Sequence, residues 1–362
     1  MVKNAVIEQP TFASAFTGIG GFEIGFEKAG WKNQVMIEIN EHCQTVLKRW
    51  FPNVPLMGDI CDVKGTALQS PTVFLGGFPC TNTSQAAPNR LGLAGSESCL
   101  YWEFHRLLDE HLRLVDAAKP RWVVIENPEG LLASPGVCRQ KSPCYRGCTC
   151  GTDRTGRDMA AVLGGLEDCG YGWAFRTVDG GSLGTPQRRR RVIVVGHRGP
   201  DPRPAWAVLG DHGSGGEPGG SPGDGWEANR PHPVPGPVGP SGAVIFRKSA
   251  RPTKSRALGG SETWVPAEFA NVLTGNDGGL PTRQTHLMLQ NGRIRTFNHL
   301  EWERLQGFPD GWTDTMPNSA RFKALGNAMH TGTSYWLARR LLLVNNAIPY
   351  HGERFLQLAK AV

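Results

Sequence analysis

A single cysteine, residue 80, follows an apolar run. Its position suits a reactive thiol better than a side chain that only packs in the core. The sequence Gly-Gly-Phe-Pro-Cys occupies residues 76–80, directly after the apolar residues 72–75. Such a run is typical of a buried strand, and the glycines permit close backbone approaches that a Cβ would block. A thiol at the carboxyl end of a parallel strand can be reached by a ligand and activated by its surroundings, so we predict that Cys80 is a nucleophile. The alternative is that Cys80 is one more small apolar residue of the core.

A carboxylate follows a second apolar run. Residues 121–125 indicate another buried strand, and Glu126 comes directly after it. Parallel strands joined by right-handed crossovers end at the same edge of a sheet. We therefore expect Glu126 and Cys80 to act on one substrate, as an acid and a nucleophile.

Four consecutive arginines, residues 188–191, lead into a third apolar run at residues 192–195. Side chains alternate between the two faces of a strand, so Arg189 and Arg191 share a face. We expect one pair of arginines to point into the site and the other pair to be solvated. The alternative, a charged strand edge that discourages pairing, explains the number of arginines poorly.

A glycine-rich turn opens the chain. The strand-like residues 12–16 lead into Thr-Gly-Ile-Gly-Gly at residues 17–21, and a helix is predicted to follow and to end at Gly30 in a left-handed conformation. Such a turn lets a ligand approach backbone N–H groups at the start of a helix. Glu38 follows the next strand, residues 35–37, at a spacing that suits an acid accepting both hydroxyls of a ribose. The pattern indicates an adenosine-containing cofactor, and the alternative for Glu38 is a solvated glutamate at a strand end.

The elements between these motifs predict alternating strands and helices. A helix over residues 41–50 leads to Asp59 and Ile60, which close a third strand–helix unit and place Asp59 where it could meet the exocyclic amine of an adenine. An amphipathic crossover helix is expected within residues 100–118. A helix over residues 158–168 and a strand over residues 173–178 then lead to the arginines.

Composition favours one large domain that carries an insertion. In residues 199–242, 22 of 44 positions are glycine or proline, so we predict a flexible insertion with little regular structure. Five basic side chains then follow within residues 246–256 and make a plausible phosphate-contacting surface, with a solvated loop as the alternative: Arg247, Lys248, Arg251, Lys254 and Arg256. The formal charge of +7 favours a polyanionic partner, with nucleic acid as the leading candidate.

The cysteines predict a reducing environment. Their number, nine, is odd, the N-terminus has no signal-peptide pattern, and no apolar run approaches the length of a membrane span, so we expect a cytoplasmic protein without a membrane partner. Cys138, Cys144, Cys148 and Cys150, hereafter the cysteine cluster, could hold a structural zinc ion, although their spacing is irregular. Free thiols in a polar loop are the alternative.

Two helices are predicted in the last part of the chain. Residues 295–309 suggest a helix that is stopped by Gly307 and Pro309, and residues 324–330 precede an apolar helix over residues 335–344. The apolar helix must pack back on elements already formed.

Taken in order, these stretches resemble the DNA (cytosine-5)-methyltransferase family across most of the chain outside residues 197–290. The matching residues are Phe16-Thr17-Gly18-Ile19-Gly20-Gly21 for the cofactor loop, Glu38 for the ribose-binding acid, Gly77-Phe78-Pro79-Cys80 with Ser84 for the nucleophile motif, Glu126-Asn127 for the catalytic glutamate, Gln187, Arg189 and Arg191 for Gln-x-Arg-x-Arg, and residues 304–309 and 326–328 for the last two motifs. Two positions depart from the family pattern: Thr81 stands in place of the usual glutamine and Pro128 in place of the usual valine. Neither departure removes a reacting group, so they bear on pocket packing and on how the target base is held.

The resemblance implies an enzyme that transfers a methyl group from S-adenosylmethionine to carbon 5 of a flipped-out cytosine in double-stranded DNA, through an adduct of Cys80 with carbon 6. It implies catalytic roles for Cys80, Glu126, Arg189 and Arg191. It implies cofactor contacts from Phe16, Thr17, Gly18, Ile19, Gly20, Gly21, Glu38, Ile39, Asp59, Ile60, Pro79, Asn327 and Ala328. Contacts to DNA are expected from Ser84, Gln187, Arg247, Lys248, Arg251, Lys254 and Arg256. A monomer in a prokaryotic or phage-infected cell, with a role such as restriction–modification, is the expected setting.

The expected fold is a doubly wound α/β methyltransferase domain of Rossmann-like type. We expect it to span residues 1–196 and to be completed by residues 318–362, with a small target-recognition domain at 197–290 and a hinge at 291–317. Three other functions compete with this prediction: RNA cytosine-5 methylation, a catalytically silent DNA-binding relative, and a nicotinamide-dependent oxidoreductase. The oxidoreductase shares only the glycine turn and Glu38 and leaves Cys80 and Glu126 without roles.

Overall fold

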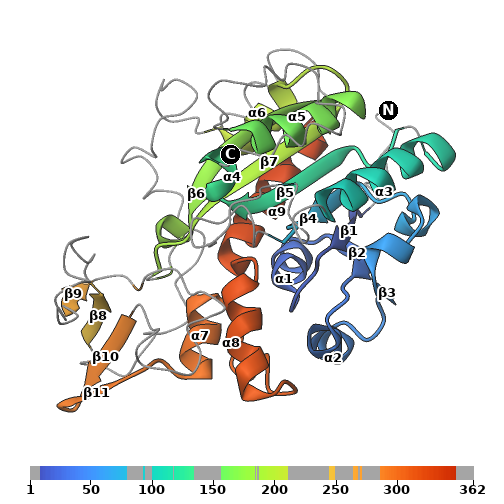
Figure 1. Cartoon of the computed structure of the whole chain (residues 1–362). Helices are drawn as coiled ribbons and strands as arrows, with labels where there is room; N and C mark the ends of the chain where they lie inside the picture. The colour runs from blue at the N-terminus through green and yellow to red at the C-terminus, as the bar shows by residue number, and fades with distance from the viewer. Residues whose placement is uncertain are drawn as a thin grey trace, which may run out of the picture.

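A seven-stranded sheet forms the centre of the molecule, in the strand order β3-β2-β1-β4-β5-β7-β6 (Figure 1). The computed structural model describes residues 9–79, 93, 100–116, 118–133, 156–183, 185, 187–210, 244–248, 264–267, 270 and 286–347. The strands are β1 Thr11–Ala15, β2 Lys32–Ile37, β3 Leu56–Met57, β4 Val73–Gly76, β5 Trp122–Pro128, β6 Tyr171–Asp179 and β7 Arg190–Arg198. β1 to β5 are parallel, whereas β7 runs antiparallel to both of its neighbours, β5 and β6. The predicted doubly wound α/β fold is confirmed.

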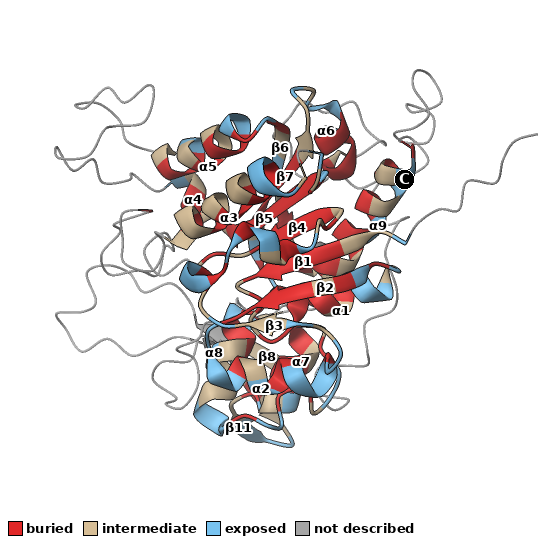
Figure 2. Cartoon of the chain, turned by 90° about the vertical axis from the view of Figure 1, so that its right-hand side faces the viewer, coloured by how far each residue is buried: buried red, intermediate tan, exposed pale blue. Residues whose placement is uncertain are grey.

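Helices cover both faces of this sheet. They are α1 Gly21–Lys28, α2 Glu41–Trp50, α3 Tyr101–Leu114, α4 Gly130–Ala133, α5 Arg157–Asp168, α6 Arg203–Leu209, α7 His299–Leu305, α8 Asn318–Asn327 and α9 Thr331–Ala347, with short 3₁₀ turns at Ile60–Asp62, Gly65–Leu68 and Gly180–Leu183. Because side chains alternate along a strand, Phe74 of β4 belongs to a core with Leu107 of α3 and Val162 of α5. Its neighbour Leu75 belongs to a second core, with Phe26 of α1 and Leu337 of α9. The inner strands β1, β2, β4 and β5 are buried along most of their length (Figure 2).

A smaller antiparallel sheet lies apart from the large one (Figure 1). Its order is β11-β10-β8-β9, from β8 Val244–Lys248, β9 Trp264–Ala267, β10 His286–Gln290 and β11 Arg293–Arg295. A third core joins it to the large domain, since Met288 of β10 clusters there with Trp302 of α7 and with Ile19 of the glycine turn. The insertion predicted at residues 197–290 therefore contains regular structure in its second half.

The first residues of the predicted insertion belong to the large domain. β7 continues to Arg198, and α6 packs against β6, β7 and α9. The buried Arg340 of α9 donates from Nε to the carbonyl oxygen of Val208 at 2.5 Å and also binds the carbonyl of Gly210. We therefore place the start of the insertion after Gly210 rather than after residue 196, because these hydrogen bonds hold α6 on the sheet despite the prolines around it.

The helix predicted at residues 295–309 begins later than expected. Arg295 is the last residue of β11, and α7 starts at His299 because Asn298 caps it: the Asn298 side chain accepts from the Glu301 N–H, and the Glu301 side chain accepts from the Asn298 N–H. The last apolar helix begins earlier than predicted, since α9 starts at Thr331 rather than at residue 335.

Candidate active site

β5 continues past the end of β4, which brings Glu126 to the turn that leads to Cys80. The strand predicted to stop at residue 125 runs on to Pro128, because Glu126 is still paired with Ile193 of β7. The two strands pair in register with Gly76 opposite Ile125. A Cβ placed on Gly77 would lie 3.3 Å from Oε2 of Glu126. The Asn127 side chain donates from Nδ2 to the carbonyl oxygen of Phe78 at 3.0 Å, which fixes the turn on the end of β5. Pro79 is the last described residue of this turn, and Cys80 and Ser84 lie outside the described residues.

Arg191 reaches Glu126 from the neighbouring antiparallel strand. Its Nε lies 2.9 Å from Oε1 of Glu126, and both side chains are nearly buried. In the pairing of β5 with β7, Arg191 lies opposite Pro128 rather than opposite Glu126. The arginine side chain therefore extends along the paired strands to reach the Glu126 carboxylate. The resulting ion pair orients the carboxylate at the strand end. Glu126 and Arg191, two of the predicted catalytic residues, are therefore in contact.

Arg189 lies on the same face but has different partners. It is buried, and its guanidinium donates from Nη1 to the carbonyl of Gly326 at 3.1 Å and from Nη2 to the carbonyl of Ala328 at 2.6 Å. These carbonyls lie at the C-terminus of α8, where the last C=O groups of a helix have no N–H donor within the helix. Arg188 and Arg190 are exposed, so the predicted alternation is confirmed. These contacts hold the last motif rather than Glu126, and the catalytic role of Arg189 stays a prediction.

Gln187 occupies the junction between the large domain and the insertion. Its backbone forms a bridge with Ala270, and the N–H of Arg188 donates to the Ala270 carbonyl at 3.0 Å. The Gln187 side chain is fully buried, and neither of its amide atoms makes a hydrogen bond with a described residue. A buried amide of this kind is free to bind a substrate group, which fits the predicted contact to DNA.

The glycine turn is hydrogen-bonded to Glu38, the predicted ribose-binding acid. Gly18 and Gly20 have φ angles of 61° and 90°, which favour glycine, and the Gly18 N–H donates to Oε2 of Glu38 at 2.7 Å. Oε1 of Glu38 accepts from the N–H of Asn40 at 2.8 Å. Burial raises the pKa of Glu38, and the backbone hydrogen bonds act against that rise. A carboxylate has about four acceptor positions, so these backbone hydrogen bonds do not use all of them and a ribose hydroxyl can still be bound.

The surroundings of this turn fit an adenosine. A Cβ on Gly18 would meet no atom within 4 Å, so the turn has open space beside it. Ile39 is 63% exposed directly after the acid and offers an apolar surface there. Asp59 caps a 3₁₀ turn by accepting from the N–H of Cys61 at 2.9 Å through Oδ1, and Ile60 is buried behind it. The residues therefore fit S-adenosylmethionine, and the contact of Asp59 with adenine stays a prediction.

The remaining cofactor residues form the back of the turn. Phe16 has a positive φ of 57°, and Thr17 joins β1 to β2 by donating from Oγ1 to the Ile37 carbonyl at 3.2 Å. A Cβ on Gly21 would lie 2.3 Å from the carbonyl oxygen of Met329, so α1 starts in close contact with the last motif. Ala328 in that motif is buried and Asn327 is exposed.

A buried carboxyl beneath the glycine turn was not predicted from the sequence. Glu23 of α1 is fully buried and accepts from Oγ of Ser14 at 2.5 Å, and Ser14 also bonds Oγ1 of Thr17. Burial raises the pKa of Glu23 to about 7, although the bond from Ser14 lowers it. No local pattern distinguishes this glutamate from a solvated one in the first turn of a helix.

The predicted phosphate-contacting and metal-binding residues fall mostly outside the described chain. The backbones of Arg247 and Lys248 lie in β8 and pair with β9. Arg251, Lys254, Arg256 and the cysteine cluster lie outside the described residues, so the zinc site stays a prediction. Among the residues that are described, no group of His, Cys, Asp or Glu is arranged to hold a metal ion. Within the same residues, no helix is both long and apolar enough to span a membrane.

Two curated methyltransferases are similar to this chain in sequence. The Type II methyltransferase M2.BsuMI of Bacillus subtilis (strain 168) is 28% identical over 350 residues, which cover 94% of this chain and 77% of that protein. M.NlaIV of Neisseria lactamica, also a Type II methyltransferase, is 29% identical over 196 residues, and only 42% of its length is covered.

Solved structures show the same fold at low sequence identity. A mutant of DNMT2 from Spodoptera frugiperda matches with a TM-score of 0.59 at 14% identity, covering 92% of this chain and 99% of that one. The methyltransferase EhMeth of Entamoeba histolytica matches with a TM-score of 0.57 at 14% identity, over 92% of this chain and 98% of that one. The model of the C-5 cytosine-specific DNA methylases matches residues 11–205 and 248–342. This chain therefore belongs to the C-5 cytosine-specific DNA methylase family, as its motifs predicted, and methylation of DNA cytosine at carbon 5 is the reaction of that family.

Proposed function

We propose that the chain methylates carbon 5 of a flipped-out cytosine in double-stranded DNA, with Cys80 as the nucleophile and Glu126 as the acid. The observation that carries this proposal is the position of the Glu126 carboxylate, which lies 3.3 Å from where a Cβ on Gly77 would be, beside the turn that leads to Cys80. An acid beside a nucleophile at paired strand ends can act on two atoms of one ring.

Cytosine needs activation because its carbon 5 is a poor nucleophile. In the proposed mechanism the Cys80 thiolate forms a bond to carbon 6, and the electron pair displaced from the ring moves towards N3 and O2. Glu126 holds a proton at N3, and Arg191, which is ion-paired to Glu126 at 2.9 Å, stabilises charge at O2. Loss of the carbon 5 proton after methylation breaks the carbon–sulfur bond and restores both the aromatic ring and the thiolate.

S-adenosylmethionine supplies an electrophilic methyl group when it is bound. The chain would hold it with the glycine turn of residues 16–21, with Glu38 and Ile39 at the end of β2, with Asp59 and Ile60, and with Pro79, Asn327 and Ala328. Glu38 would bind the ribose with the acceptor positions that Gly18 and Asn40 leave available. These side chains bind and orient the cofactor and take no part in proton transfer.

Most of the contacts that we propose between the protein and DNA are electrostatic. Flipping a base out of the duplex costs a few kcal/mol, so the protein must hold the flanking backbone. We propose contacts to DNA from Ser84 and Gln187, and contacts to its phosphates from the basic residues Arg247, Lys248, Arg251, Lys254 and Arg256, in keeping with the net charge of +7. Neutralising Lys248, Arg251 and Lys254 together should weaken binding to all sequences alike and make its salt dependence shallower. A monomeric, cytoplasmic enzyme remains part of the proposal.

The proposal is tested by replacing the nucleophile. Cys80→Ser should abolish methyl transfer and leave S-adenosylmethionine binding intact, because a serine hydroxyl is a much poorer nucleophile at neutral pH. The matched control is Cys61→Ser, the same change at an exposed cysteine. The wild type should also become covalently trapped on DNA that contains 5-fluorocytosine, since fluorine cannot leave as a proton does. Turnover by Cys80→Ser would refute the role of Cys80, and methylation of RNA in preference to DNA would refute the proposed substrate.

A further inference from the structure

Trp312 is hydrogen-bonded to the middle of the glycine turn, although the two segments are far apart in sequence. Its indole Nε1 donates to the carbonyl oxygen of Ile19 at 2.7 Å, and both residues are buried. Ile19 lies between Gly18 and Gly20, which have φ angles of 61° and 90°, so the direction of this carbonyl is part of the geometry of the turn. We propose that Trp312 is a positioning residue for S-adenosylmethionine, which acts by holding the glycine turn in its binding conformation. The inference rests on the proposed cofactor site.

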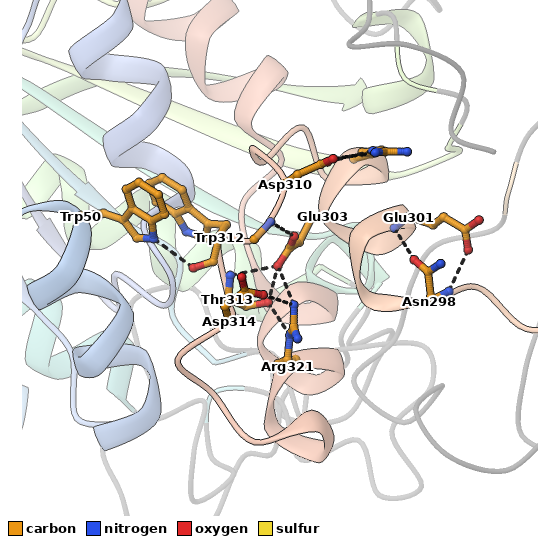
Figure 3. Close-up of polar contacts among 11 residues, drawn as sticks. Trp50, Asn298, Glu301, Glu303, Asp310, Trp312, Thr313, Asp314 and Arg321 are labelled. Atoms are coloured by element: carbon orange, nitrogen blue, oxygen red, sulfur yellow. Dashed lines mark hydrogen bonds and ion pairs between the residues drawn. The ribbon is translucent and has the colours of Figure 1, made fainter. Parts of the chain in front are cut away.

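Aromatic packing fixes the indole of Trp312 in place. Its ring stacks on Trp50 with centroids 4.5 Å apart and an angle of 5° between the planes, and Nε1 of Trp50 donates to the Trp312 carbonyl at 2.9 Å (Figure 3). Phe51 packs edge-on at 6.0 Å from the other side. A Cβ on Gly20 would lie 2.8 Å from Cε2 of Phe51, so the glycine turn fits closely against the same aromatic group. The indole therefore has little freedom to move away from Ile19.

A buried carboxylate on α7 fixes the backbone on both sides of Trp312. Glu303 is fully buried, and its Oε2 accepts from the N–H of Gly311 at 2.7 Å. Its Oε1 accepts from the N–H of Thr313 at 2.9 Å and from the Thr313 hydroxyl at 2.5 Å, and Nη2 of Arg321 lies 3.2 Å away (Figure 3). Hydrogen bonds to a charged group are stronger than neutral ones, so this set defines the turn that presents Trp312.

The opposite side of α7 is bound to the smaller sheet. Arg295, at the end of β11, donates from Nη1 to Oε2 of Glu301 at 2.9 Å and from Nη2 to Oε1 at 2.7 Å. Met288 of β10 shares one core with Trp302 of α7 and with Ile19. One short helix thus joins the smaller sheet, through Glu301, to the glycine turn, through Glu303 and Trp312. The shape of the cofactor site therefore depends on a segment that lies beyond the seven-stranded sheet.

The test is Trp312→Phe, which keeps an aromatic ring in the stack and removes the N–H donor. The glycine turn should then populate other conformations. The apparent affinity for S-adenosylmethionine should fall in proportion to the fraction of protein molecules whose turn keeps the binding conformation. We expect its Kd and KM to rise about tenfold, since a lost buried hydrogen bond changes an equilibrium by roughly that factor. At saturating cofactor, kcat and DNA affinity should stay within about twofold of the wild type. The control is Trp206→Phe, the same change at a tryptophan that is 57% exposed on α6.

A second variant, Thr313→Val, removes only the hydroxyl that donates to Glu303 and should raise KM for the cofactor in the same direction by a smaller factor. It keeps the inference testable if Trp312→Phe does not fold. Melting temperatures of all variants separate positioning from stability, because a purely structural role would lower them and leave KM at 25 °C unchanged. An unchanged KM in folded Trp312→Phe and Thr313→Val, or an equal rise in Trp206→Phe, would overturn the inference. Failure of the wild type to bind S-adenosylmethionine would overturn the proposed function as well.

Discussion

Glu23 offers a pH-dependent test of the buried network beneath the cofactor turn. The carboxyl is fully buried, and burial raises its pKa from the ordinary 4.5 to about 7 against the effect of the Ser14 hydrogen bond, with Glu27 and Glu38 adding repulsion. The folded protein therefore binds this proton more tightly than the unfolded chain does. The stability from that proton is fully present below about pH 4.5 and is lost as the pH rises through 7.

The size of the effect follows from the pKa difference. One pKa unit corresponds to about 1.4 kcal/mol, so the change from 4.5 to about 7 is worth about 3 kcal/mol in the free energy of unfolding. Between pH 5 and pH 8 the wild type should lose about 2 to 3 kcal/mol through this group. Glu23→Gln cannot titrate and keeps an acceptor for the Ser14 hydroxyl, so it should lack this loss.

Urea unfolding at pH 5, 6, 7 and 8 measures the difference directly. The stability of Glu23→Gln relative to the wild type should increase with pH by about 2 to 3 kcal/mol over this range. The matched control is Glu41→Gln, the same substitution at an exposed glutamate in the first turn of α2. Parallel pH profiles for the wild type and Glu23→Gln would show that Glu23 does not titrate in this range and would refute the reasoning.

Three further predictions concern the cofactor, the catalytic turn and the cysteine cluster. Glu38→Ala should weaken S-adenosylmethionine binding by about 1 to 3 kcal/mol, because it removes a charged acceptor of ligand and backbone hydrogen bonds; calorimetry that finds an unchanged Kd would move the ribose site elsewhere. Gly77→Ala places a Cβ 3.3 Å from Oε2 of Glu126 and should shift that carboxylate, lowering kcat roughly tenfold, whereas Gly164→Ala, which meets no atom within 4 Å, serves as the control. Equal kcat values in the two glycine variants would contradict this placement. Elemental analysis should find one zinc per chain, lost when cysteine cluster residues become serine; fully active, metal-free protein would argue for free thiols.

The chain order of the motifs was sufficient to predict the family and most of the large domain. Apolar runs of strand length located β4 and β5, because strand periodicity and the topology of parallel sheets are local or general rules. They predicted that the second strand ends at residue 125, whereas β5 continues to Pro128 and contains Glu126. Because glycine readily adopts the left-handed conformation that ends a helix, Gly30 predicted where the first helix ends, and its φ is 92°. The twenty-residue interval from Gly18 to Glu38 predicted an acid that binds a ribose, whereas the hydrogen bond from the Gly18 N–H to Glu38 at 2.7 Å was not predicted.

Local patterns were insufficient where a helix boundary depended on a cap or on distant packing. The Asn298 cap delays the start of α7, and Arg340 holds α6 on the sheet within a region whose glycine and proline content predicted little regular structure. The helix propensity of a short segment is a weak signal, and a single set of tertiary hydrogen bonds outweighs it.

The partners of individual site residues were decided by tertiary structure alone. Strand alternation put Arg189 and Arg191 on one face, but only the tertiary fold placed the C-terminus of α8 beside Arg189. Arg189 therefore binds the carbonyls of Gly326 and Ala328, whereas Arg191 binds Glu126. The bond from Trp312 to Ile19 joins residues 293 positions apart. Sequence determines which side chains a strand or helix presents, because periodicity is fixed by backbone geometry. Which groups meet across elements depends on how those elements pack, and that is set by the whole core at once.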